Sequence, residues 1–261
     1  MRKILSIIAA AAVSGLATPA LAADTLYLDT QHTPFYSSGD RPAGTSLLFS
    51  INGVNVRASA WSIGDDGRIH EAQLGVWSGG LGVRNGRNDN THTVDNSGYL
   101  DFLLFQFDEV VELDLARFNT GWDGISDTDA TIGYTLSGLD FGTLPGWDGQ
   151  LSSVLSPLNL YSNNYGSTGS NTRDINPNDY TGNMWLIGAS FNNPSEGSYY
   201  KQKKAADGFK LEYLTFTRPP PGVPEPSTWA MLLVGFFGLG GAMRSAKRRQ
   251  IEGQADALSA A

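Results

Sequence analysis

Apolar and polar residues alternate with a period of two along much of the chain between residues 25 and 217. The clearest runs are 111–118 and 209–217, where successive side chains take opposite faces of an extended strand. Such alternation predicts half-buried antiparallel strands. Residues 99–107 are apolar at nearly every position, which predicts a central strand that is covered on both faces.

About ten such strands are expected, separated by turns rich in Gly, Asn, Asp and Ser. They are predicted at 25–29, 45–51, 54–63, 69–77, 99–107, 110–118, 131–136, 158–161, 184–191 and 209–217. This spacing predicts an all-β fold, a single antiparallel β-sandwich of jelly-roll type. Residues 163–178 are predicted to form a long loop, Asp65-Asp66-Gly67 a type I′ hairpin turn, and Asn88-Asp89-Asn90 another turn.

The first 22 residues have the pattern of a secretory signal peptide. Two basic residues, Arg2 and Lys3, precede an apolar stretch that is predicted to form a short helix. Small residues then mark the cleavage site, with Ala20 and Ala22 before Ala23. Translocon and signal peptidase are therefore expected partners.

The C-terminal region has the pattern of a membrane anchor. Thr228 to Met243 is an uncharged run of 16 residues, and the basic cluster that follows it is Arg244, Lys247, Arg248 and Arg249. Residues 228–249 are predicted to hold a transmembrane helix and this cluster, because flanking basic side chains extend a short apolar span. The positive-inside rule then places 250–261 in the cytoplasm and the domain 23–218 outside.

A Pro-rich linker, residues 219–227, joins this domain to the anchor and contains the sequence Val223, Pro224, Glu225 and Pro226. The order of this motif, the apolar run and the basic cluster closely resembles the PEP-CTERM sorting signal. The resemblance covers about 30 residues. It implies that exosortase, a membrane-bound cysteine protease, recognises the chain near the Pro-Glu-Pro motif. It also implies an association with exopolysaccharide. Unlike most family members, the chain continues for 12 residues after the basic cluster.

Residues 75–134 are similar to the corresponding part of exosortase-dependent surface proteins. This resemblance implies a β-sandwich surface domain of undefined ligand, and no catalytic residue carries over from it. The formal charge of residues 24–222 is −11, from 12 Lys and Arg against 23 Asp and Glu, which disfavours nucleic-acid binding. Because the chain has no cysteine, disulfides, thiolate metal sites and cysteine nucleophiles are excluded.

Three aspartates, Asp123, Asp127 and Asp129, are candidate ligands of a structural Ca²⁺ ion. Asp127 and Asp129 are two residues apart and would point the same way from a strand, and Ca²⁺ takes six to eight oxygen ligands. Three further residues are candidates for additional oxygens: Asp95, Asn96 and Asp101. The alternative is a solvated acidic loop, because the EF-hand spacing is absent.

The sequence favours a binding protein over an enzyme. No Gly-x-Ser-x-Gly elbow is present, and His92 is interpreted as structural because no nucleophile motif accompanies it. Four tryptophans are candidates for stacking on sugar rings, although burial is the commoner fate: Trp61, Trp77, Trp122 and Trp147. The expected protein is an exported surface or matrix protein that binds polysaccharide or protein. A polysaccharide-modifying hydrolase and a self-assembling matrix protein remain alternatives.

Overall fold

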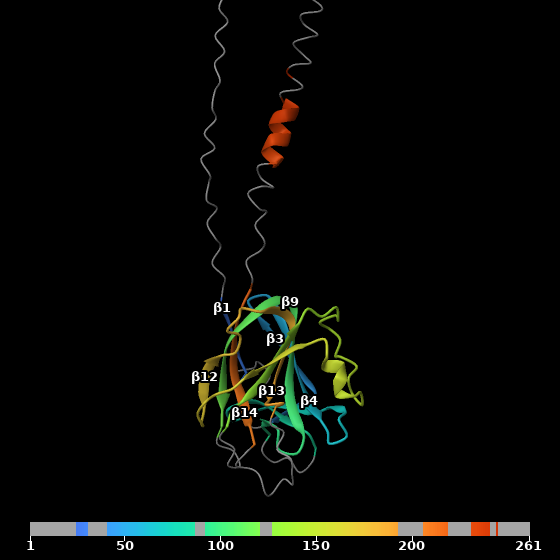
Figure 1. Ribbon diagram of the computed structural model, residues 1–261, viewed down its shortest axis with the longest axis vertical. Coiled ribbons are helices and arrows are strands. Elements are labelled where there is room, and N and C mark those ends of the chain that lie inside the picture. Colours follow the sequence, from blue (N-terminus) through green and yellow to red (C-terminus); the bar gives the residue numbers. More distant parts are fainter. Residues whose placement is uncertain are drawn as a thin grey trace, which may run out of the picture. The chain divides into compact units, whose positions relative to one another are not determined.

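The computed structural model describes residues 25–30, 41–86, 92–120, 127–192, 206–218, 231–240 and 244. Most of these residues form antiparallel β-structure (Figure 1). The strands are β1 Thr25–Asp29, β2 Arg41–Gly44, β3 Ser46–Ile51, β4 Val54–Ile63, β5 Ile69–Glu71, β6 Gln73–Trp77, β7 Gly80–Arg84, β8 Val94–Asp95, β9 Leu100–Asn119, β10 Ala130–Thr135, β11 Asn159–Asn163, β12 Asn171–Asp174, β13 Thr181–Ala189 and β14 Gly208–Thr217, with a short 3₁₀ helix, η1, at Ser152–Leu155. The predicted all-β character is confirmed.

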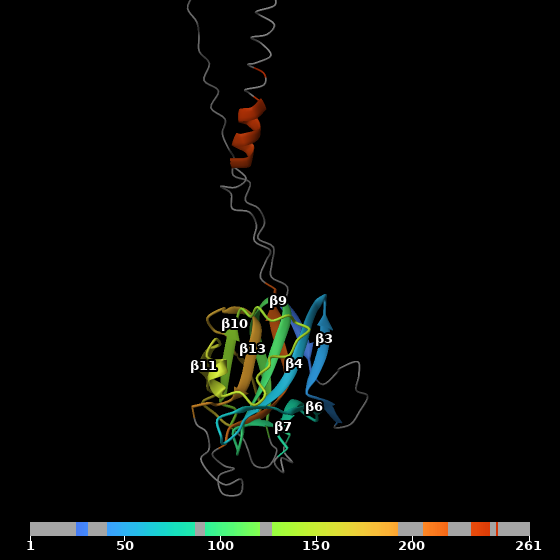
Figure 2. The same ribbon diagram turned by 90° about the vertical axis from the view of Figure 1, so that its right-hand side faces the viewer.

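The strands form one large sheet with the order β11-β10-β13-β9-β14-β7-β6-β2. Further strands attach beside this path: β4 and β12 pair with β9, β1 and β8 pair with β14, and β3 and β5 pair with β4. Figure 2 shows β11, β10, β13, β9, β4 and β3 side by side. All pairings between named strands are antiparallel in the described part of the chain.

The long strand β9 has two different sets of neighbours. Its residues 100–107 pair with β4, and residues 102–106 and 111–112 pair with β13. Residues 112–119 pair with β14 and residues 115–118 with β12. Residues 101–107 are buried, as the run of apolar residues predicted, and burial alternates over residues 111–114 and again over 116–119. The sequence predicted two strands separated near Asp108. The structure shows one continuous strand, in which Asp108 is exposed and its carboxylate accepts hydrogen bonds from the backbone and side chain of Asn55.

Two clusters of apolar side chains hold the sheet together. The main core collects residues from β9 and from strands on both sides of it, including Val56, Phe105, Trp185 and Phe216, all 0% exposed. The second cluster lies on the opposite face of β4, β9 and β13 and includes Trp61 and Phe102. Burial of aromatic side chains of this size supplies much of the stability of a domain that lacks disulfides.

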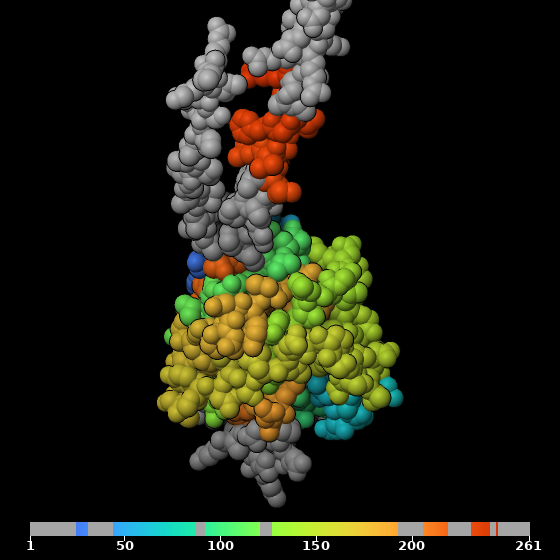
Figure 3. All heavy atoms as spheres, turned by 45° about the horizontal axis from the view of Figure 1, so that its top comes forward, coloured from blue at the N-terminus to red at the C-terminus, as the bar shows by residue number. Residues whose placement is uncertain are grey.

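Residues 136–158 cover the second cluster as a strap. Leu155 and Leu158 contribute apolar side chains, and the strap is hydrogen-bonded to β5, for example from Ile69 N–H to the Gln150 carbonyl at 2.8 Å. The Gln106 side-chain amide also donates to the Thr143 carbonyl at 3.0 Å. In the space-filling view of Figure 3, yellow-green to gold atoms of the strap and of the strands after it cover much of the visible face.

Several predicted boundaries differ from the structure. The predicted strand 69–77 is divided at Ala72 into β5 and β6, and β2, β7, β8 and β12 were not predicted. Strand β12 lies inside the predicted loop 163–178. Strand β7 is rich in glycine, yet Gly82 is required there because a Cβ atom would lie 1.8 Å from the His92 carbonyl oxygen.

The predicted hairpin at Asp65-Asp66-Gly67 is confirmed, but its turn type was wrong. Ile63 of β4 pairs with Ile69 of β5, and only Gly67 of the three turn residues has a positive φ, +72°. The Gly64 N–H donates to the Arg68 carbonyl at 2.8 Å, and this hydrogen bond closes a loop made of Asp65, Asp66 and Gly67, which is longer than two residues. A type I′ turn needs two consecutive residues with positive φ.

The chain divides into two compact units, Met1–Pro219 and Pro220–Ala261. Within the second unit, residues 231–240 are helical and their large apolar side chains are exposed, from Leu232 at 48% to Phe237 at 77%. Apart from these residues and the helical Arg244, the predicted span 228–249 lies outside the described residues. No helix in the described part of the chain has the length and apolar character needed to cross a membrane.

Candidate metal centre

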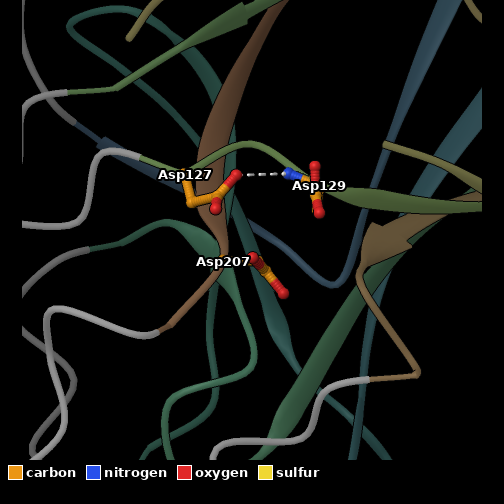
Figure 4. A group of neighbouring side chains, drawn as sticks. All are labelled: Asp127, Asp129 and Asp207. Carbon is orange, nitrogen blue, oxygen red and sulfur yellow. Dashed lines mark hydrogen bonds between the residues drawn. The ribbon is translucent and has the colours of Figure 1, made fainter. Parts of the chain in front are cut away.

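Three carboxylates from two distant parts of the sequence meet at one place. Asp129 directly precedes β10, with Asp127 two residues before it, and Asp207 directly precedes β14. One carboxylate oxygen of each lies within 4.8 Å of the others. Figure 4 shows the three side chains grouped around a common space.

Backbone hydrogen bonds fix this arrangement. Asp127 and Asp207 form an isolated parallel bridge, in which the Gly208 N–H donates to the Asp127 carbonyl at 2.9 Å. The Asp129 N–H donates to Oδ1 of Asp127 at 3.3 Å, and Oδ1 of Asp129 accepts from the Tyr165 N–H at 2.7 Å. The carboxylates therefore approach one another because the ends of β10 and β14 are held together by the main chain.

Asn96 connects a third segment to the cluster. Its Nδ2 donates to Oδ2 of Asp207 at 2.8 Å and to the Ser190 carbonyl at 3.2 Å, while its Oδ1 accepts from the Asp207 N–H at 2.9 Å. Asp207 is only 2% exposed. This reciprocal pairing holds a buried carboxylate in one orientation.

The electrostatics of the site favour a bound cation or a bound proton. Burial, followed by the carboxylates of Asp127 and Asp129, raises the pKa of Asp207 to about 7, although the hydrogen bond from Asn96 opposes this shift. Burial likewise raises the pKa of Asp129, against the lowering effects of the Tyr165 N–H and of Arg173. Like charges this close cannot all ionise without a compensating positive charge.

Arg173 supplies part of that compensation. Its guanidinium donates to the Thr128 carbonyl at 2.6 Å and to the Asn163 carbonyl at 3.0 Å, and it lies 4.0 Å from the ring centroid of Phe118. Burial lowers the pKa of Arg173 to about 10, while Asp129 and Asp127 act in the opposite direction. One guanidinium against three carboxylates leaves the cluster negative when all of them are ionised.

The donors suit a hard divalent cation. All of them are oxygens, and Ca²⁺ prefers carboxylate and carbonyl oxygens. The residues that would hold it are Asp127, Asp129 and Asp207, with water completing the coordination. A metal here would have a structural role, since it would join the starts of two strands.

The structure brings together only part of the predicted ligand set. Asp123 lies outside the described residues, and Asp207 was not predicted. Asp95 accepts hydrogen bonds from Thr93 and from the Ser97 N–H. Asp101 accepts from Ser62 at 2.5 Å.

Of the other predicted site residues, some are buried or half-buried and others lie outside the described residues. Trp61 and Trp77 are 0% and 6% exposed, and half-buried Trp147 packs on Trp61 at 5.7 Å, so Trp61 and Trp77 present no platform for sugars. His92 stacks on Trp77 at 4.7 Å, consistent with a structural role. Residues outside the described ranges are Trp122, Asn88-Asp89-Asn90, the cleavage residues Ala20, Ala22 and Ala23, the motif Val223 to Pro226, and Lys247, Arg248 and Arg249.

The chain was compared with family models, with curated proteins and with solved structures. The chain matches no family model, no curated protein and no solved structure.

Proposed function

We propose that this chain is an exported cell-surface or matrix protein that is sorted by exosortase and whose β-domain binds polysaccharide or protein without catalysing a reaction. The observation that carries the proposal is the order of three features in the sequence: Pro224-Glu225-Pro226, the uncharged run Thr228 to Met243, and the basic cluster that begins at Arg244. With the N-terminal signal peptide, this order fits an export route that ends at the cell envelope.

The described part of the chain supports this reading in two ways. Strand β14 ends at Thr217 and the first compact unit ends at Pro219, so the sorting motif follows the β-domain in the sequence. The helical residues 231–240 expose their apolar side chains, as expected of a segment whose natural surroundings are lipid.

A sandwich of jelly-roll type is the proposed form of the sheet. Along β9 the paired strands change from β4 and β13 to β14 and β12, with β13 still paired at residues 111 and 112, and side chains from both groups enter the main core. A strand that passes from one layer to the other is a usual way of making the corner of such a fold.

The carboxylate cluster gives the hydrolase alternative little support. Asp207 has the raised pKa expected of a general acid, but at 2% exposure its carboxyl cannot touch a glycosidic oxygen. A ligand or a matrix partner would instead contact the exposed faces of the sheet.

The sorting proposal is tested in the bacterium that encodes the chain. The full chain carries a C-terminal epitope and is followed with an antibody against the β-domain, in cells with and without exosortase. The exported protein is expected to lose the epitope and leave the inner membrane only when exosortase is present. Replacing Pro224, Glu225 and Pro226 by alanine is expected to keep the uncut protein in the membrane.

The matched control replaces Pro219, Pro220 and Pro221, in the same linker, by alanine and is expected to be processed normally. Sorting by this signal is wrong if the exported protein keeps its C-terminal epitope, or if the triple change at residues 224–226 leaves processing unaltered.

A further inference from the structure

The strand pairing places a set of polar and aromatic side chains on one outward face of the sheet. Tyr27 of β1 pairs with Thr215 of β14, and Tyr213 of β14 pairs with Arg117 of β9, which pairs in turn with Thr172 of β12. Cross-strand partners lie on the same face of a sheet. We call this the tyrosine face. Its centre is Tyr27, Asp29, Tyr213, Arg117 and Thr172, and the same strands add the threonines Thr25, Thr215 and Thr217 and the acids Glu112 and Asp174.

Two tyrosines form the centre of this face. Their ring centroids are 4.8 Å apart, and Tyr27 is 50% exposed although it lies in the middle of a strand. The Tyr213 hydroxyl is 3.1 Å from Oγ1 of Thr172. The exposed ring of Tyr27 and the half-buried ring of Tyr213 lie beside a row of hydroxyl groups. This arrangement matches the two sides of a pyranose ring, whose C–H face is apolar and whose edge is polar.

Carboxylates dominate the charge around the rings. The acids that act on Tyr27 are Asp29, which is opposite Tyr213 in the strand pairing, and Glu212. Glu112 of β9 and Asp174 of β12 are further carboxylates of this face, and Asp179 is close enough to act on Glu112. Burial first, and then Asp179 and Asp174, raises the pKa of Glu112, which shows that this group of acids repels itself. Among the residues that the structure describes on this face, the one cation is Arg117, which is 3.5 Å from the carboxylate of Glu212.

The negative charge of these carboxylates determines which charge a ligand of the tyrosine face should carry. A polymer of uronic acids would be repelled by the carboxylates, whereas a chain bearing ammonium groups would be attracted to them and to the faces of the tyrosine rings. Within the proposed role as a polysaccharide-binding surface protein, on which this step rests, we propose that the tyrosine face binds an amine-bearing polysaccharide, with sugar rings on Tyr27 and Tyr213 and ammonium groups beside Glu112 and Asp174.

A basic peptide is the competing ligand, because it would satisfy the same charges. The glycan is favoured by the threonine hydroxyls that border the rings, Thr25, Thr215 and Thr217, since they can pair with sugar hydroxyls across a flat surface.

The test measures binding of a glucosamine hexamer to the full chain in mild detergent by calorimetry. The wild type is expected to bind the hexamer, with an affinity that falls as salt rises, and to bind the N-acetylated hexamer at least about fivefold more weakly. Changing both Tyr27→Ala and Tyr213→Ala is expected to weaken binding by about tenfold or more. Glu112→Gln with Asp174→Asn is expected to weaken it and reduce its salt dependence.

Matched controls lie on other surfaces. Leu48→Ala removes a side chain that is 49% exposed on β3, and Glu71→Gln neutralises an exposed acid on β5; both are expected to change the affinity less than about twofold. Thermal unfolding confirms that each variant is folded.

Three results would overturn the proposal: no binding of the glucosamine hexamer, binding that survives the double tyrosine change, or tighter binding of a lysine hexapeptide that the same change abolishes. The last result would assign the face to a basic protein. Epitope loss in cells is measured separately, so a failure here leaves the sorting signal standing.

Discussion

Asp114 shows how one residue can break a sequence pattern. Alternation predicted Val111, Leu113 and Leu115 on one face, but Leu115 is 41% exposed and Ala116 is buried instead. The register between β9 and β14 shifts here, since Leu113 pairs with Phe216 and Ala116 pairs with Leu214. A β-bulge at residues 114 and 115 is the cause, and a period of two cannot reveal it.

The same residue predicts a pH effect on stability. Burial, and then Glu112, Asp174 and Asp179, raises the pKa of Asp114 to about 6, well above that of an unfolded aspartate. Between about pH 4 and 6 the folded chain therefore holds more protons at this group than the unfolded chain, so its contribution to stability falls as pH rises. Asp114→Asn is expected to flatten this part of the stability profile and to raise the midpoint of thermal unfolding at pH 7 by about 2 °C.

Thermal unfolding from pH 4 to 8 measures this effect, with Asp140→Asn in an exposed loop as the control. An unchanged slope between pH 4 and 6 in Asp114→Asn would show that the acids around it do not repel one another as the structure indicates.

Among the structural elements, the hairpins could be predicted best from the sequence. The contacts between strand ends that are distant in the sequence could be predicted least. Asn52-Gly53 lies between two predicted strands, and both residues have positive φ, 49° and 86°, as a type I′ turn requires. Strands β2 and β12 have four residues each and no apolar alternation, so no pattern marks them. Asp207 shares with Asp129 a position just before a strand, but nothing in the sequence shows that β10 and β14 begin side by side.

That junction predicts stabilisation by calcium. Millimolar Ca²⁺ is expected to raise the midpoint of thermal unfolding above the midpoint in EDTA. An ion that binds only the folded state stabilises that state by about 2.7 kcal/mol when the ion concentration is a hundred times its dissociation constant. Asp127→Asn, Asp129→Asn and Asp207→Asn are each expected to reduce this shift, while Asp140→Asn is expected to preserve it.

The same aspartate variants also distinguish neutralisation of the cluster by a bound metal ion from neutralisation by a bound proton. If the wild type shows no calcium shift and Asp207→Asn is more stable than the wild type in EDTA at pH 8, the cluster is neutralised by protonation and the metal prediction is wrong.

Across the whole molecule, the sequence predicted the β class and most long strands, since these depend on local alternation and on apolar content. It did not predict which strands pair with each part of β9, or that residues 136–158 cover the second cluster. Both features depend on contacts between segments that are distant in the sequence. All members of the two clusters lie between Leu26 and Phe216.

The first unit is therefore expected to fold without the C-terminal region. A chain that ends after Arg218 is expected to keep its thermal unfolding midpoint within about 2 °C of the full chain in the same detergent, because no residue of either cluster is removed. Circular dichroism and scanning calorimetry measure this. A lower midpoint, or loss of a cooperative transition, would show that residues after 218 contribute to the stability of the sheet.

The pairing of the first and last strands determines how the domain responds to mechanical load. Thr25 is opposite Thr217, so the chain enters and leaves the sheet at neighbouring points. A force between these two points pulls across the strands and opens their hydrogen bonds in succession, as a zipper opens, instead of shearing them all at once. Tension between the two ends would peel β1 from β14 first and draw Leu26 and Leu28 out of the main core, so the domain would yield at low force along this direction.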